Sequence, residues 1–461
     1  MTQRLLTWDP NFINANIDAN IDTNIDMTRI NLINVNLNPL FCPPNDDLLL
    51  FDLKEPKQTK IIYVSSSHME NFTKELLDKY DFDIERLELN YSNILGILDL
   101  AKFNTLTYLD CSFNKITNII NIPSTLKYLN TSFNHLKHLD LKCATNLKHL
   151  NCGNNFIKTI ANIPSTIKCL FANENLLSNQ LNLEHCINLE KLNIDLNKLE
   201  LLHVPHSVEF LWVYDNDIQI IVGIQNCSKL KVFECSNNTN FTNWNNLPDN
   251  LETLVCMKCS ISKFNKLPTG LCELYCSYNS ITNLNNLPPN LAKLVCENVN
   301  ITNLDNLPCG LKILICSRGW PITHEKYFNN LDNLPESLEE LDCANCVKIT
   351  QLDNLPRGLI KLNCVGTRVT NFYCLPETIK ELEIRPDDES ELKLCLLPKS
   401  LVHLCLHSSH PCKNLKMDDY VKQHLKKVSL SSINTCDVEI IKDMNEFGIS
   451  VVKYDHRLYI D

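Results

Sequence analysis

The chain has 461 residues, and 44% of them are hydrophobic, which is enough for a large buried core. Glycine is scarce, with only 9 residues, so a glycine-rich cofactor-binding fold is not expected. The formal net charge of −11 argues against a surface that mainly binds nucleic acid or an anionic membrane.

The first part of the chain differs from the rest in its pattern. Residues 16–26 (NIDANIDTNID) form a low-complexity four-residue repeat, which is typical of a disordered segment; a degenerate start of a repeat array is the competing interpretation. Residues 60–64 have the pattern of a strand and residues 68–80 that of a helix. Together they are expected to cap the elements that follow.

The sequence predicts neither secretion nor membrane insertion. The first residues lack an apolar stretch of signal-peptide length, and no run of about 18 apolar residues predicts a membrane span. We therefore expect a cytoplasmic protein in a reducing compartment, with its 23 cysteines present as thiols.

From residue 84 onward the pattern L-x-x-L-x-C recurs at a nearly constant interval, as in LTYLDC from Leu106 and LETLVC from Leu251. The copies begin at residues 84, 106, 126, 147, 167, 189, 208, 230, 251, 271, 291, 311, 338, 359, 379 and 401. Fourteen of the fifteen intervals are 19 to 22 residues long, and the interval after Leu311 is 27. This regularity indicates a repeat architecture.

Each copy predicts one short strand followed by a return. A single copy cannot bury its own leucines, so about sixteen copies are expected to stack into a parallel β-sheet over a continuous Leu, Ile and Cys core. About twenty residues per turn leave too few for a full helix in the return. Proline recurs there, so the returns are expected to be mostly extended or turn-like.

Asparagine also recurs, eight residues after the first Leu of a copy. The positions are Asn114, Asn134, Asn155, Asn175, Asn197, Asn216, Asn238 and Asn279. An inward-facing Asn ladder would hydrogen-bond backbone groups at the bend after each strand. The ladder lapses at Cys259, Val299, Gly319 and Cys346.

The L-x-x-L-x-C-x-x-N series resembles leucine-rich-repeat proteins. Its short N-L-P-x-x-L return is similar to the short-repeat type of bacterial effectors, and its Cys- and Asn-rich form looks like leucine-rich-repeat proteins of giant, mimivirus-type DNA viruses. The resemblance covers about residues 84–430. It implies a leucine-rich-repeat solenoid, or horseshoe, with a parallel β-sheet on the concave face and small α/β caps.

We accordingly divide the chain into three parts. Residues 1–83 are a low-complexity segment with an N-terminal cap, residues 84–410 the solenoid, and residues 411–461 the last repeat and a C-terminal cap. In the last part, residues 417–427 and 437–447 have helical patterns, LKKVSL from Leu425 is a candidate last copy, and ISVVKY from Ile449 predicts a final strand.

The cysteines are interpreted as core residues. Nine occupy the sixth position of a copy: Cys111, Cys152, Cys235, Cys256, Cys276, Cys296, Cys316, Cys343 and Cys364. In-register parallel strands would point these thiols the same way, which is poor geometry for disulfides. Two C-x-x-C pairs, Cys256/Cys259 and Cys343/Cys346, lie four copies apart, so at one strand spacing (~4.8 Å) per copy about 20 Å separates them and no single metal could join them.

No motif in the sequence predicts catalysis. His403, His407 and His410 lie near one another, and the first two alternate with apolar residues and so share one strand face; we interpret them as surface histidines. A nucleophile elbow, a phosphate-binding loop and an H-E-x-x-H motif are all missing. We expect no enzymatic activity, no cofactor and no metal.

The side chains between the core leucines are expected to face the concave side. There the middle copies carry apolar and aromatic residues, which we call the concave strip: Phe171, Phe210, Trp212, Tyr214, Val255, Tyr275, Val295 and Ile315. An exposed strip of this kind is typical of a protein-binding site. The competing interpretation is that such residues simply suit strands. A second candidate is the seven-residue excess after Leu311, which contains Trp320.

The sequence therefore favours a non-enzymatic scaffold that binds a protein partner, with a host protein as the partner if the viral resemblance holds. It predicts no nucleic-acid partner and no membrane partner. A structural component of a virion is the alternative. A ubiquitin-ligase-type effector is disfavoured because only about fifty residues follow the repeats.

Overall fold

A computed structural model describes residues 84–319, 327–385, 397–407, 423–430, 444–446 and 448–453. The chain divides after Lys57 into two units, and every described residue belongs to the second, Gln58–Asp461. The expected N-terminal cap, Trp320, His410 and most of the expected C-terminal helices lie outside the described residues. The division of the chain at residues 83 and 410 therefore stays a proposal.

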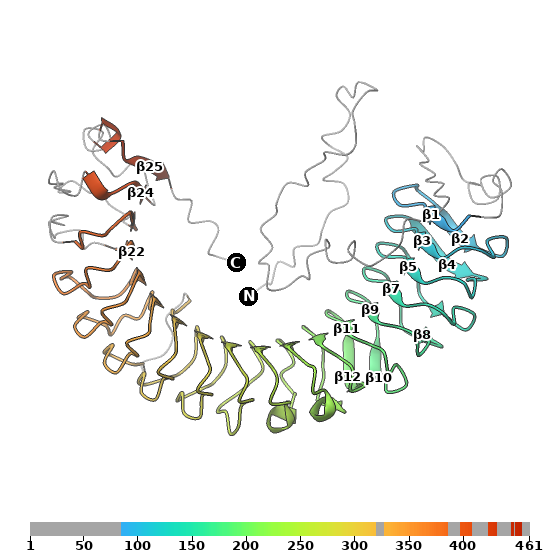
Figure 1. Cartoon of the computed structure of the whole chain (residues 1–461), viewed down its shortest axis with the longest axis horizontal. Coiled ribbons are helices and arrows are strands. Elements are labelled where there is room, and N and C mark those ends of the chain that lie inside the picture. The colour runs from blue at the N-terminus through green and yellow to red at the C-terminus, as the bar shows by residue number, and fades with distance from the viewer. Residues whose placement is uncertain are drawn as a thin grey trace, which may run out of the picture. The chain divides into compact units, whose positions relative to one another are not determined.

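The second unit is built on one 18-stranded parallel sheet whose strands pair in chain order. Its strands are β1 (Arg86–Glu88), β3 (Tyr108–Asp110), β5 (Tyr128–Asn130), β7 (His149–Asn151), β9 (Cys169–Phe171), β11 (Lys191–Asn193), β13 (Phe210–Trp212), β15 (Val232–Glu234), β16 (Thr253–Val255), β17 (Glu273–Tyr275), β18 (Lys293–Val295), β19 (Ile313–Ile315), β20 (Glu340–Asp342), β21 (Lys361–Asn363), β22 (Glu381–Ile384), β23 (His403–Leu406), β24 (Lys427–Leu430) and β25 (Ser450–Lys453). Figure 1 shows these strands on the inner side of the curved unit.

The repeat sets the register of the sheet. The leucine at the centre of one strand pairs with the equivalent residue of the next, as in Leu109 with Leu129. The same register holds between Leu314 and Leu341, across the 27-residue interval. Every strand therefore presents its central residue to the core and its two flanking residues to the other face.

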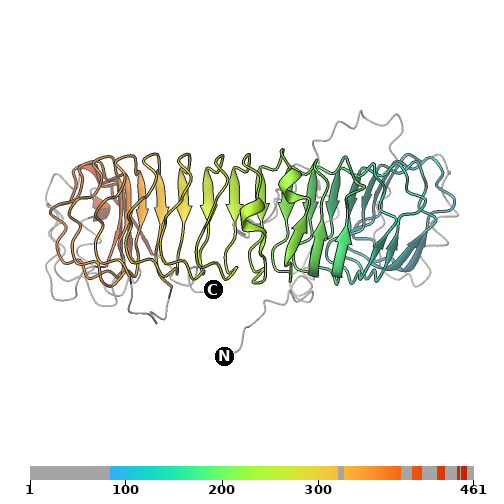
Figure 2. The ribbon, with the colours of Figure 1, turned by 90° about the horizontal axis from the view of Figure 1, so that it is seen from below.

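The returns are extended or turn-like, as the short repeat predicts. They contain the paired strands β2 (Leu95–Asp99) and β4 (Lys115–Ile120), β6 (Leu139–Asp140) and β8 (Ile160–Ala161), and the three-stranded set β10 (Ser178–Asn182), β12 (Lys198–His203) and β14 (Ile220–Val222). Two short 3-10 helices follow, η3 (Ile224–Asn226) and η4 (Asn243–Asn246). Figure 2 shows the successive turns side by side, and the predicted solenoid with little helix is confirmed.

The core consists of the repeat leucines and the cysteine column. Leu109, Cys256 and Leu294 are fully buried, and all nine cysteines of the sixth position are buried. Several of these thiols donate to a carbonyl of the next coil; Cys111 Sγ, for example, lies 3.4 Å from the Asn130 carbonyl oxygen. The prediction that this column packs in the core is confirmed.

The predicted Asn ladder is also confirmed. The amide nitrogen of Asn155 donates to the carbonyls of Thr131, Cys152 and Gly153 at 3.0–3.1 Å. Its Oδ1 accepts the Leu136 backbone N–H at 2.9 Å. One buried side chain thus accepts the Leu136 N–H and shares its two amide hydrogens among three carbonyls at the bend, each of which also accepts from a second donor.

Cysteine takes over part of this role where the ladder lapses. Cys259 Sγ lies 3.3 and 3.4 Å from the carbonyl oxygens of Cys235 and Met257, and its one proton can be donated to either. Cys346 Sγ lies 3.5 Å from the Cys316 carbonyl oxygen. The second cysteine of each C-x-x-C pair therefore stands in for an asparagine, although a thiol satisfies fewer backbone groups than an amide does.

Candidate interaction surface

Two residues of each strand face the concave side, the third and the fifth of the repeat. In the middle of the sheet the third residue is mostly half-buried and the fifth is mostly buried, as in β13, β16, β17 and β18. Neighbouring strands lie only about 4.8 Å apart, so side chains of equal position on adjacent strands pack against one another.

The concave strip lies on this face, but most of it is covered. Trp212 is 8% exposed and Tyr275 is 5% exposed, and Phe171, Val255 and Val295 are also buried. The expectation that these side chains lie open to solvent is wrong, because their neighbours on adjacent strands cover them.

Three members of the concave strip do reach solvent: Phe210, Tyr214 and Ile315 are half-buried. The rings of Phe210 and Trp212 stack with centroids 5.8 Å apart. The ammonium groups of Lys191 and Lys231 lie 5.5 and 6.0 Å from the Phe210 ring. We call Phe210 and Tyr214, together with the buried Trp212, the aromatic centre. Two lysine ammonium groups lie beside its Phe210 ring.

Two buried carboxyl groups lie beside this aromatic centre. Glu234 pairs with Trp212 across the β13–β15 ladder and is 1% exposed. One of its oxygens accepts the Ser236 N–H at 2.8 Å, and the other, Oε2, has no hydrogen-bond partner among the described residues. Burial raises the pKa of Glu234 to about 8 and that of Asp195 to about 7.

The structure shows two groups of aromatic side chains that the sequence analysis did not single out. At the third position, Tyr108 and Tyr128 stack with centroids 4.4 Å apart, and the Arg86 guanidinium lies 4.0 Å from the Tyr108 ring. His149 continues this group on the next strand, with its ring 6.4 Å from that of Tyr128. Aligning the third residues of successive copies would have revealed this group, because those residues pair on adjacent strands.

The second group follows the first strands of the sheet. Tyr91, Phe113 and Phe133 stack in a row with centroids 4.3 Å apart, and Tyr91 is 67% exposed. All three have left-handed backbone conformations, with φ near +54°. Bulky side chains rarely adopt this conformation, so the bend of the repeat imposes it. The three residues form an exposed apolar row at the amino-terminal end of the solenoid.

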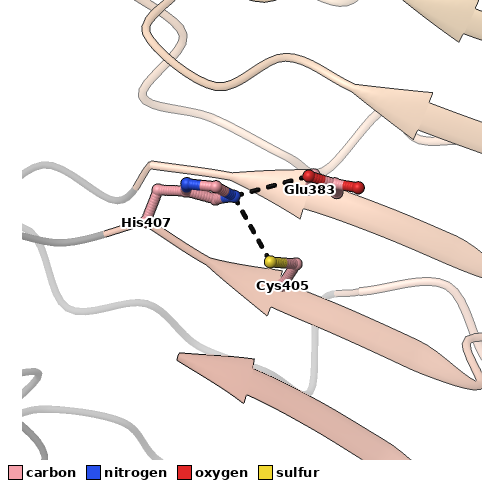
Figure 3. Close-up of side chains that lie close together, drawn as sticks. All are labelled: Glu383, Cys405 and His407. Atoms are coloured by element: carbon pink, nitrogen blue, oxygen red, sulfur yellow. Dashed lines mark hydrogen bonds and ion pairs between the residues drawn. The ribbon is translucent and has the colours of Figure 1, made fainter. Parts of the chain in front are cut away.

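A third cluster lies near the carboxyl end of the sheet, and we call it the C-terminal cluster: Glu383, Cys405 and His407. Figure 3 shows the three side chains pointing toward one another from β22 and from β23 with the residue that follows it. His407 is 9% exposed, so its interpretation as a surface histidine is wrong. His403 is half-buried and its Nε2 lies 2.9 Å from the Ser429 hydroxyl.

None of the helices in the described part of the chain has the length and apolar character that crossing a bilayer requires.

Comparison with known proteins identifies the fold. No protein-family model matches the chain, and no curated protein matches it by sequence. Among solved structures, YopM from Yersinia enterocolitica is similar at 23% identity, covering 78% of this chain and 85% of YopM, with a TM-score of 0.52. A leucine-rich-repeat protein from Leptospira interrogans is similar at 16% identity, covering 86% of this chain and all of the other, with a TM-score of 0.53.

The fold is a leucine-rich-repeat solenoid. CroV588, a circular leucine-rich-repeat protein, is also similar, at 15% identity over 82% of this chain and 67% of its own, with a TM-score of 0.47. At these identities the likeness concerns the leucine-rich-repeat architecture and not a particular activity.

Proposed function

We propose that this leucine-rich-repeat solenoid is a non-enzymatic scaffold that binds a protein partner on its concave face. The parallel sheet offers a long, rigid surface, and folds of this kind generally serve protein interaction. The observation that carries the proposal is the aromatic centre, in which half-buried Phe210 stacks on buried Trp212 and two lysines lie beside the Phe210 ring. Such an arrangement has the composition of an interaction hot spot.

Within the concave strip, the partner is proposed to touch the half-exposed members. Phe210, Tyr214 and Ile315 are accessible, whereas Trp212 and Tyr275 are buried. Truncation of an accessible ring removes partner contact and leaves the core intact. Truncation of Trp212 also removes packing between adjacent strands, so its effect on binding would include a structural part.

The test is an affinity capture that compares matched variants of the full chain. Wild type, Phe210→Ala, Tyr214→Ala and the control Ile187→Ala serve as baits, and captured proteins are quantified by mass spectrometry. Ile187 is a large apolar residue that is 58% exposed and lies outside the concave strip. We expect a partner that wild type and Ile187→Ala retain equally and that the two aromatic variants lose by about tenfold or more, since hot-spot truncations cost at least ~2 kcal/mol.

A partner retained equally by all four baits would show that the aromatic centre is not the binding site. Circular dichroism of the Phe210→Ala and Tyr214→Ala proteins, matching wild type, would establish that lost binding is not lost folding.

We also propose that the chain is a viral protein whose partner is a host protein in the host cytoplasm. The support is the likeness of its Cys- and Asn-rich repeat to the leucine-rich-repeat proteins of giant DNA viruses. The capture experiment tests this, because a partner encoded by the virus itself, or recovery of the chain as a component of purified particles, would favour a structural role in the virion.

A further inference from the structure

We propose that Glu383, Cys405 and His407 bind a zinc ion, with three protein ligands and a fourth coordination position open toward the concave face. The sequence analysis expects no metal, so this inference departs from it. It also does not depend on the proposed function, because metal binding by the purified chain is measured without a partner.

The geometry of the C-terminal cluster is that of a set of metal ligands. Cys405 Sγ lies 3.3 Å from His407 Nε2, and Glu383 Oε2 lies 3.4 Å from the same nitrogen. One ligand atom from each residue lies within 4.8 Å of the other two. Tetrahedral zinc, with bonds of about 2.0–2.3 Å, holds neighbouring ligand atoms roughly 3.3–3.6 Å apart. A zinc ion therefore fits between these atoms with small side-chain movements.

The ligand types also match zinc. Thiolate sulfur, imidazole nitrogen and carboxylate oxygen are its three protein ligands, and a mixed set with a soft sulfur disfavours calcium and magnesium. Among the described residues, this is the only group of three or more His, Cys, Asp and Glu side chains whose ligand atoms converge in this way.

Two interactions of this cluster converge on one atom. Both the thiol and the carboxylate approach the same ring nitrogen, Nε2 of His407. If Nε2 carries a proton, it can donate to the carboxylate, but the thiol then finds no acceptor there. If Nε2 is unprotonated, it can accept from the thiol, but its lone pair then faces the carboxylate. A cation between the three atoms would instead coordinate all of them at once.

The fold holds the three ligands in place. Glu383 and Cys405 are register partners on the adjacent strands β22 and β23. His407 follows β23 by one residue, and its backbone N–H donates to the Ile384 carbonyl at 2.9 Å. Two ligands therefore lie on rigid strands and the third on backbone that is hydrogen-bonded to the neighbouring strand. A site built in this way needs little reorganisation to bind metal.

Access to the site is through the carboxylate. Cys405 and His407 are buried, whereas the side chain of Glu383 is 40% exposed. Three protein ligands leave one position of a tetrahedral ion for water or for a group offered from outside, as in sites that remain open. On binding, the thiol of Cys405 loses its proton to solvent and coordinates as the thiolate.

The experiment measures zinc on the full chain. The purified protein is stripped with EDTA, desalted, reloaded with zinc chloride and dialysed against metal-free buffer, and bound zinc is counted by inductively coupled plasma mass spectrometry. Affinity is measured by competition with a chromophoric zinc chelator. The variants are Glu383→Gln, Cys405→Ser and His407→Gln. The controls are His403→Gln, a histidine of the same strand outside the cluster, and Cys374→Ser, an exposed thiol in the return segment before β22.

We expect each of the three cluster variants to bind this zinc about tenfold more weakly or worse, and both controls to bind it like wild type. Cobalt substitution gives a second signature, a thiolate-to-cobalt charge-transfer band that Cys405→Ser abolishes and Cys374→Ser keeps. Zinc affinity that is unchanged in Glu383→Gln and Cys405→Ser, or no retained zinc in wild type, would overturn the proposal. Glu383→Gln keeps the test valid if a buried substitution disturbs folding, because its side chain is the most exposed of the three.

Discussion

Replacement of Glu234 by Gln tests whether a carboxyl group is held neutral beneath the concave face. The pKa of Glu234 is raised to about 8 by burial, against 4.5 for an unperturbed glutamate. Between these two values the folded protein keeps a proton that the unfolded chain has released, so stability falls as pH rises from about 4.5 and levels off above about 8. The carboxyl group therefore destabilises the fold by about 1 kcal/mol at pH 5 and by about 3 kcal/mol at pH 7.

Glutamine has nearly the same shape and no charge, so Glu234→Gln should remove this pH-dependent cost. We expect the variant to be more stable than wild type by about 1 kcal/mol at pH 5 and by about 4 kcal/mol at pH 8, less any loss at the Ser236 hydrogen bond, which is the same at both pH values. The assay is urea unfolding followed by circular dichroism at both pH values. The control is Glu252→Gln, the same substitution at an exposed glutamate on the neighbouring repeat.

A stability gain that is the same at pH 5 and at pH 8 would refute the reasoning. It would mean that Glu234 ionises in the folded protein near its ordinary pKa, and hence that water or a cation reaches its Oε2 atom.

Two further predictions concern the core. Asn155→Ala should destabilise the protein by about 1–3 kcal/mol, because it leaves the buried Leu136 N–H without an acceptor and removes one of the donors to three carbonyls; an unchanged urea midpoint would contradict this. In the native protein, iodoacetamide should label the exposed Cys143 but not Cys276, whose pKa burial raises to about 12. Peptide mass spectrometry before and after denaturation checks this, and equal labelling of both thiols in the native state would show that the cysteine column is open to reagent.

The repeat itself was predictable because it is a one-dimensional pattern. The spacing of the leucines fixes where each strand begins, and stacking then fixes the register, so pairs such as Leu109 with Leu129 follow from counting. The Asn ladder was predictable for the same reason, since a polar residue at one fixed position of a buried turn needs a common backbone partner.

Exposure on the concave face was not predictable from the same pattern. Alternation shows which way Trp212 points, but its 8% exposure depends on the size of its neighbours on adjacent strands. The C-terminal cluster was missed for a related reason. Glu383 lies 22 residues before Cys405, and only the pairing of their strands brings the two side chains together. His403 and His407 were singled out together in the sequence. In the structure His403 contacts the Ser429 hydroxyl, whereas His407 contacts the Cys405 thiol.

The asparagines give the solenoid a mechanical polarity. Asn114 accepts the N–H groups of Ser92 and Ile94 and donates to the carbonyl of Leu89, all three of which belong to the coil before it. Each ladder asparagine thus binds backbone groups of the coil before it and none of the coil after it. If the chain is shortened from the carboxyl end, each lost coil takes with it the asparagine that hydrogen-bonds to the backbone of the coil before it. If it is shortened from the amino end, the asparagine of the new first coil loses its backbone partners and is hydrated instead. The asparagine hydrogen bonds of the remaining coils are unchanged. Unzipping should therefore advance more readily toward the amino terminus than away from it.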